Sequence, residues 1–184
     1  MQSTMDVRVI ARAGLVAALL AVSAWVSIPL GPVPFTLQTM VLAILPIAFD
    51  RPTALVAVGC YLLLGAIGLP VFAGFGAGLG TLMGPTGGFL WGFFLGTLAA
   101  TTLVALLPRP VPALVRALAA DAVMLAISYA CGTVQLMAVM GIDPAAALAL
   151  AVLPFIVPDA VKLAVGASIG LSVRMALAGG MRTA

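Results

Sequence analysis

Histidine is absent from this sequence of 184 residues, and its only lysine is Lys162. Without histidine the chain has no Ser-His or Cys-His nucleophile and no histidine-based metal site. Lys162 lies in Pro-Asp-Ala-Val-Lys-Leu rather than in the Gly-Lys-Ser/Thr ending of a P-loop, so no such loop of this chain hydrolyses ATP. The two cysteines, Cys60 and Cys131, are too few for a disulfide scaffold.

Charge is also scarce, since only 7% of the residues are charged and 64% are hydrophobic. A soluble domain typically has about 25% charged residues. The mean hydropathy of +1.31 agrees with this deficit. The sequence therefore predicts an all-α integral membrane protein, with residues 1–184 as one membrane domain surrounded by lipid. The net charge of +3 is too small and too scattered for a nucleic-acid partner.

Charges and prolines divide the chain into apolar runs. A membrane span needs about 20 apolar residues. The first run has a basic start and resembles a signal peptide, but the spans that follow favour a helix that is retained. We predict six spans, at approximately 9–30, 37–49, 53–70, 88–107, 113–139 and 158–177.

Three connections are unusual for loops of a membrane protein. The run at 37–49 is too short to cross a bilayer alone, so we expect the proline-rich segment 28–39 to enter the membrane as irregular backbone. Such backbone is tolerated where it is buried in protein or lines a cavity. The glycine-rich connection 71–87 has no charge, so it is either buried in the membrane or packed closely on other helices. Its glycines allow backbone or a ligand to approach closely. The third connection is 141–157.

The distribution of arginine predicts the orientation of the spans. With six spans, one side of the membrane holds Arg8, Arg12, Arg51, Arg109, Arg116, Arg174 and Arg182. The loops of the other side contain no arginine or lysine and only Asp143. By the positive-inside rule both termini lie in the cytoplasm, and the connections 28–39, 71–87 and 141–157 lie on the outer side of the cell membrane.

Two ionisable residues, Asp159 and Lys162, lie near the outer end of the last predicted span. Ionisable groups inside a bilayer are costly and are candidates for a functional site. At positions i and i+3 they share a helix face, where the ammonium could hold a ligand carboxylate and the carboxylate could accept N–H donors. Alternatively, Asp159 suits a helix N-terminus and Lys162 extends outward to the membrane surface beside it.

Other polar and aromatic residues on the outer side are candidates to complete a binding pocket. These are Phe35, Thr36, Gln38, Phe75, Thr86, Tyr129 and Gln135. Asp121 lies nearer the cytoplasmic side in the fifth span, so we interpret it as a structural partner or a gating residue rather than a ligand contact.

The first span carries small residues at Ala13, Ala17 and Ala21. This i, i+4, i+8 ridge allows another helix to approach closely. The other helix belongs either to a partner subunit or to this chain.

Four segments together resemble the BioY family, the substrate-binding S subunits of energy-coupling-factor (ECF) biotin transporters. They are Ile-Pro-Leu-Gly-Pro-Val-Pro-Phe-Thr-Leu-Gln-Thr at 28–39, Gly-Leu-Pro-Val-Phe-Ala at 68–73, Gly-Pro-Thr-Gly-Gly-Phe at 84–89 and Pro-Phe-Ile-Val-Pro-Asp-Ala-Val-Lys at 154–162. The resemblance covers nearly the whole chain. It implies a six-helix S-subunit fold, high-affinity capture of biotin from the outer side, and no catalytic or metal site.

The resemblance also implies partners and residue roles. The partners are a transmembrane coupling subunit and two cytoplasmic ATPase subunits, which alone use ATP, so this chain needs no cofactor. Lys162 would bind the valerate carboxylate of biotin and Asp159 the ureido N–H groups. Ala13, Ala17 and Ala21 would dock on the coupling subunit. Near the glycine-rich connection this chain has no Asn or Arg, so no second cation for the carboxylate is implied.

Three other functions remain as alternatives. An intramembrane aspartyl enzyme would need Asp121 and Asp159 in contact, but they map to opposite ends of the membrane. A stand-alone secondary transporter of biotin or another small carboxylate vitamin would usually show a second repeat, and none is evident. A purely structural membrane subunit would need neither the two buried charges nor the charge-free outer loop.

Overall fold

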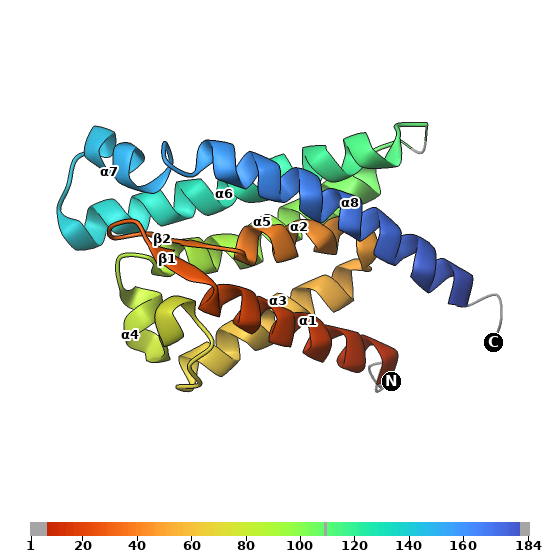
Figure 1. The fold of residues 1–184 in the computed structure, drawn as a ribbon, viewed down its shortest axis with the longest axis horizontal. Coiled ribbons are helices and arrows are strands. Elements are labelled where there is room, and N and C mark those ends of the chain that lie inside the picture. Colours follow the sequence, from red (N-terminus) through yellow and green to blue (C-terminus); the bar gives the residue numbers. More distant parts are fainter. Residues whose placement is uncertain (1–6, 109, 181–184) are drawn as a thin grey trace.

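The structure is a computed structural model that describes residues 7–108 and 110–180. Four of its helices are long and apolar enough to cross a membrane: α1 (Val7–Trp25), α5 (Gly87–Leu106), α6 (Ala113–Met140) and α8 (Ile156–Gly180). Two shorter apolar helices, α2 (Gln38–Ala48) and α3 (Arg51–Ala66), lie among them (Figure 1). These elements agree with the predicted helical membrane bundle of six spans.

The remaining elements gather at the end of the bundle opposite the two termini (Figure 1). They are the strands β1 (Ser27–Pro29) and β2 (Pro34–Thr36), the 3-10 turn η1 (Ala73–Phe75), and the short helices α4 (Gly78–Met83) and α7 (Pro144–Ala151). The three predicted outer connections therefore converge at one end of the molecule.

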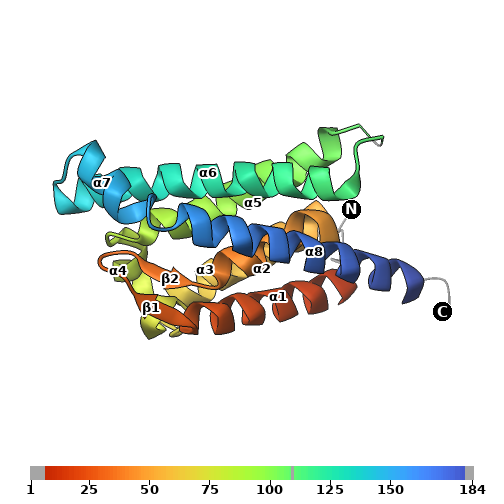
Figure 2. The same cartoon turned by 45° about the horizontal axis from the view of Figure 1, so that its top comes forward.

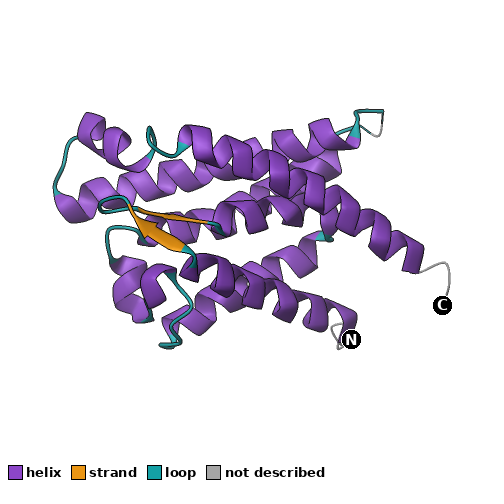
Figure 3. Ribbon diagram, viewed as in Figure 1, coloured by secondary structure: helices purple, strands orange, loops and turns teal. Residues whose placement is uncertain are grey.

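The segment 28–39 differs from the expectation of irregular backbone. It contains an antiparallel hairpin that pairs Ser27 with Thr36 and Ile28 with Phe35, the two strands drawn in orange in Figure 3. Gly31, with φ of 108°, lies in the turn between them, a conformation that favours glycine. Each strand has only the other as its neighbour, so the pairing tolerates Pro29 opposite Pro34 at its turn end.

Small residues bring the long helices close together. A Cβ added to Gly92 on α5 would lie 2.5 Å from the Cα of Ser128 on α6, and one added to Gly96 would lie 2.7 Å from the carbonyl oxygen of Met124. The α5–α6 and α2–α8 pairs run side by side in both views (Figures 1 and 2). Close helix packing therefore explains part of the glycine content.

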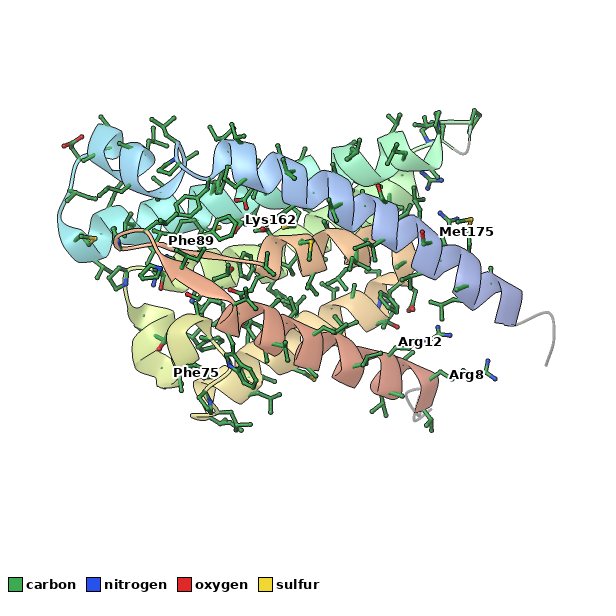
Figure 4. All side chains as sticks on the ribbon, viewed as in Figure 1. Arg8, Arg12, Phe75, Phe89, Lys162 and Met175 are labelled. Carbon is green, nitrogen blue, oxygen red and sulfur yellow. The ribbon has the colours of Figure 1, made fainter. Side chains whose placement is uncertain are left out.

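The charges separate along the bundle as the arginine pattern predicted. Arg8 and Arg12 lie at the end that holds the termini (Figure 4). There α3 begins with Arg51, and Arg116 lies in the first turn of α6. Asp143 lies at the opposite end, where its side chain caps α7 by accepting from two backbone N–H groups. Arg109 and Arg182 of the same prediction lie outside the described residues.

Candidate functional site

A cavity of about 170 Å³ lies between the hairpin, the glycine-rich connection and the ends of α5, α6 and α8 near it. A single buried water needs only about 15 Å³ by the same kind of measure, so the space accommodates a small organic molecule. Its lining residues are Pro32, Val33, Pro34, Thr36, Gln38, Thr39, Phe72, Ala73, Thr81, Thr86, Phe89, Leu90, Phe93, Leu125, Ser128, Tyr129, Ala151, Phe155, Asp159 and Lys162.

Asp159 and Lys162 form a buried ion pair in the cavity wall. Both residues lie on the first turns of α8, and their Oδ1 and Nζ atoms are 2.5 Å apart. The exposed fractions are 4% for Asp159 and 7% for Lys162. Lys162 therefore does not extend to the membrane surface, and the alternative that the sequence left open is wrong for this side chain.

Two hydroxyl groups complete the surroundings of Asp159. Thr39 on α2 donates to Oδ1 at 3.0 Å, and Tyr129 on α6 donates to Oδ2 at 2.7 Å. Including Lys162, three described donors therefore reach this carboxylate from three helices. An ionised carboxylate has about four acceptor sites, so one further donor can bind.

The ammonium group of Lys162 is held by the hairpin. Its Nζ donates to the carbonyl oxygen of Thr36 at 2.8 Å and lies 3.9 Å from the centre of the Phe35 ring. An ammonium on an aromatic face at this distance makes a favourable cation–π contact. Because an ammonium has three N–H donors, two are used by Asp159 and Thr36 and one remains for a ligand.

Gln38 presents its amide beside this pair. Its Nε2 donates to the hydroxyl of Tyr61 on α3 at 2.7 Å, and its Oε1 accepts from Thr36 at 3.1 Å. Tyr61 is fully buried and packs edge-on against Phe72, with ring centres 5.4 Å apart. These contacts fix the direction of the amide in the cavity wall.

The rest of the wall is mainly apolar and aromatic. Phe89 and Phe93 come from α5, Phe72 from the glycine-rich connection and Phe155 from the residue before α8. Figure 4 shows Phe89 on the same side of the bundle as Lys162. Gly65 makes room for Phe72, because a Cβ at this glycine would overlap the phenylalanine ring. A largely apolar cavity with a few fixed polar groups is typical of a site for a small organic ligand.

Six of the nine predicted site residues line this cavity, but Phe35, Phe75 and Gln135 do not. Phe35 contacts the site only through its ring, which lies beside the Lys162 ammonium. Phe75 is 62% exposed and stacks on Trp25, with ring centres 5.4 Å apart, because η1 turns its side chain toward the end of α1. Gln135 instead donates to the carbonyl oxygens of Leu82 and Gly84, so it ties α6 to the end of α4. Phe75 and Gln135 are therefore not cavity residues in this structure.

The alanine ridge of α1 faces inward. Ala13, Ala17 and Ala21 are at most 7% exposed and belong to the main hydrophobic core, in which α1 packs on α3. Within this chain the ridge therefore packs internally, which is one of the two alternatives given above, and its docking on a coupling subunit stays a prediction. The opposite face of α1 carries the exposed residues, among them Leu15, Leu19 and Val22.

Asp121 lies fully buried on α6 outside the cavity lining. Neither of its carboxylate oxygens has a hydrogen-bond partner among the described residues. The structure thus agrees that Asp121 does not contact the ligand site, but it supplies no structural partner. Arg116 donates instead to the carbonyl oxygen of Val104.

Several residues of the site were not predicted from the sequence, among them Tyr61, Ser128 and Phe155. Tyr61 carried a usable signal, because a phenol within an apolar span needs a hydrogen-bond partner when it is buried. Ser128 resembles an ordinary residue of a membrane helix, and Phe155 resembles an ordinary apolar residue of the connection 141–157. No group of three or more Cys, Asp or Glu side chains in the described ranges could hold a metal ion.

Comparison with known proteins supports a site for a small organic ligand in a membrane transporter. Residues 1–179 match the model of the BioY family. A probable biotin transporter BioY of Pyrococcus horikoshii is 36% identical over 167 residues, which cover 87% of this chain and 92% of that protein. The biotin transporter BioY of Thermotoga maritima is 49% identical over 71 residues, which cover 39% of this chain and 42% of that protein.

The fold has a solved counterpart. A crystal structure described as the S-component for biotin from an ECF-type ABC transporter superposes with a TM-score of 0.84 over 95% of each chain, at 23% sequence identity. The predicted S-subunit fold is therefore confirmed. On the match over nearly its whole length, the chain belongs to the BioY family.

Proposed function

We propose that this chain is the biotin-binding subunit of a vitamin uptake transporter. It captures biotin at the outer face of the cell membrane and delivers it inward together with an ATP-driven coupling module. The observation that carries the proposal is the buried Asp159–Lys162 pair in the wall of an otherwise mostly apolar cavity. The names of the relatives, which are described as biotin transporters, support the choice of ligand.

The chemistry of biotin matches this cavity. Its fused rings suit the phenylalanine walls, its ureido group both donates and accepts hydrogen bonds, and its valerate chain ends in a carboxylate. In the proposal the free acceptor site of Asp159 accepts a hydrogen bond from a ureido N–H. The free N–H of Lys162 donates a hydrogen bond to the ligand carboxylate. A charge-assisted hydrogen bond contributes roughly 1.5 to 3 kcal/mol, so each contact is worth a measurable share of the affinity.

The charge balance of the cavity adds a constraint. Asp159 and Lys162 are its only charged lining residues, so the described wall is neutral without ligand. An incoming carboxylate adds one negative charge to a buried site. Lys162 must therefore share its positive charge between Asp159 and the ligand. When the ligand is bound, the hydroxyl groups of Thr39 and Tyr129 continue to stabilise the Asp159 carboxylate.

The transport step needs partners. The chain is a multi-pass membrane protein of a transporter family rather than an enzyme. Its sequence contains no P-loop, so in this proposal a transmembrane coupling subunit and two ATPase subunits supply the energy of ATP. Biotin is the cargo, and the chain uses no cofactor of its own.

Equilibrium binding of labelled biotin to the purified chain in detergent tests the proposal. Biotin and its neutral amide should both bind, and the acid should bind more tightly. The variant Lys162→Gln should lose about 10- to 150-fold in affinity for the acid and less for the amide. Arg174→Gln, which removes a cation outside this cavity, is the matched control. If neither compound binds to a chain that is folded by its thermal unfolding profile, the proposed ligand is wrong.

A further inference from the structure

A second cavity lies at the opposite end of the bundle, where the termini are. It has a volume of about 760 Å³ and lies between the end of α5, the start of α6 and the last turns of α8. Figure 4 shows Met175, one of its lining residues, near this end of α8. It shares no lining residue with the biotin cavity.

The charges of this second cavity are all positive. Arg116 and Arg174 line it, and no carboxylate is among its lining residues. Arg116 donates from one terminal nitrogen to the carbonyl oxygen of Val104 at 2.5 Å, but its Nε is buried without a hydrogen-bond partner among the described residues. Arg174 is exposed and makes no hydrogen bond or ion pair within 7–108 or 110–180. Neither guanidinium group is neutralised by a described carboxylate, and both line the cavity, so both can bind an anion there.

The start of α6 adds to this positive field. Ala113, the first residue of α6, lines the cavity, and Pro112 before it provides no side-chain cap. The first N–H groups of a helix have no partner within the helix, and the helix dipole is positive there. Backbone donors and two guanidinium groups thus surround the same space, an arrangement suited to the oxygens of a phosphate.

The remaining wall is apolar. It includes Leu107, Leu171 and Met175, of which Met175 is exposed. A soluble phosphate gains nothing from such side chains, whereas the acyl chains of a lipid pack against them. The positive-inside pattern places this end at the cytoplasmic leaflet, where anionic lipids attract basic residues.

We propose that this cavity binds the phosphate headgroup of an anionic phospholipid of the cytoplasmic leaflet, with Arg116 and Arg174 as its ligands. The site is independent of the biotin cavity and of the proposed transport function. The lipid would hold the start of α6 against the last turns of α8, so it would also stabilise the folded bundle.

Native mass spectrometry of the delipidated chain in a neutral detergent tests this proposal. Phosphatidylglycerol should bind more tightly than zwitterionic phosphatidylcholine. Arg174→Gln should weaken phosphatidylglycerol binding about fivefold, and Arg116→Gln with Arg174→Gln about 25-fold, since a basic residue contributes about 1 kcal/mol at such a surface. Phosphatidylcholine binding should not change. Arg51→Gln, which removes an exposed arginine at the same end of the bundle, is the matched control and should retain wild-type binding.

Three outcomes would overturn the proposal. The first is equal affinity of the wild-type chain for the two lipids, and the second is unchanged phosphatidylglycerol binding by the double variant. The third is displacement of the lipid by glycerol 3-phosphate at a similar concentration, which would assign the cavity to a soluble phosphate. Arg116 contacts Val104, so the double variant tests the proposal only if it is folded. If it is unfolded, the single variant Arg174→Gln, at an exposed position, tests the proposal alone. An affinity for phosphatidylglycerol equal to that of the wild type would then overturn it.

Discussion

Lys162 and Asp159 lie one turn apart on α8 and make an ion pair of 2.5 Å while each is more than nine-tenths buried. Removing two charges from water is costly, and their attraction offsets this cost only when other hydrogen bonds satisfy them. Here Thr36, Thr39 and Tyr129 supply those bonds from three different elements. The pair therefore links the hairpin, α2, α6 and α8 around one cavity.

The first prediction concerns stability. Lys162→Gln leaves the Asp159 carboxylate buried without its counter-charge, which should lower the free energy of unfolding by about 3 to 5 kcal/mol. The double variant Asp159→Asn with Lys162→Gln removes both charges and should recover most of this loss. Chemical unfolding of the three proteins in the same detergent measures the difference. A double variant no more stable than the single one would show that the hydroxyl contacts of Asp159, rather than the charge pair, hold this region together.

The second prediction concerns topology. After Cys60 and Cys131 are replaced, a cysteine at Gly80 on the glycine-rich connection should react with an impermeant thiol reagent applied to intact cells. A cysteine at Arg51 should react only after the membrane is permeabilised. Both positions are exposed, so access to the reagent depends on the side of the membrane. Labelling of both from the same side would contradict the orientation that the arginines predict.

The sequence predicts the region of the site better than it predicts which side chains line the cavity. Asp159 and Lys162 were predictable because residues at i and i+3 of a helix share a face whatever surrounds them. Tyr129 and Gln135, by contrast, are six residues apart on α6, which turns their side chains about 120° from each other. Only Tyr129 faces the cavity, and nothing in the sequence of α6 indicates which of the two it is.

The loops were the least predictable part. In 28–39 the prolines suggested irregular backbone, but pairing between the two halves of the segment forms a hairpin. Phe75 follows Gly74, whose φ is 62°, and its own φ is 61°. This left-handed turn points the ring at Trp25 rather than into the cavity. Such a conformation depends on neighbours that are distant in sequence, so composition alone predicts only the end of the membrane at which these residues lie.

The third prediction tests the close packing of α5 on α6. Gly92→Ala should lower the free energy of unfolding by about 1 to 3 kcal/mol, because the added methyl group would meet Ser128 at 2.5 Å. Gly14 on α1 has nothing within 4 Å of an added Cβ, so Gly14→Ala is the control. It should be neutral or stabilise the helix by up to about 1 kcal/mol. Equal stabilities of the two variants would mean that α5 and α6 separate easily.

The fourth prediction distinguishes internal packing from subunit docking on α1. Ala17 is buried in the core and Ala18 beside it is exposed. Ala17→Trp overpacks the contact with α3 and should lower the melting temperature, since such insertions cost at least about 1 to 3 kcal/mol. Ala18→Trp adds the same side chain toward lipid and should melt like the wild type. Both measurements use the purified chain without partners.

Co-purification with a coupling subunit then separates the two roles of the ridge. If the ridge only packs within this chain, Ala17→Trp should lose assembly in proportion to its lost stability, and lowering the temperature should restore both. A ridge that docks would behave differently, because Ala17→Trp would melt like Ala18→Trp and still fail to assemble. That result would require α1 to turn or move away from α3 when the partner binds, since Ala13, Ala17 and Ala21 are not accessible in this structure.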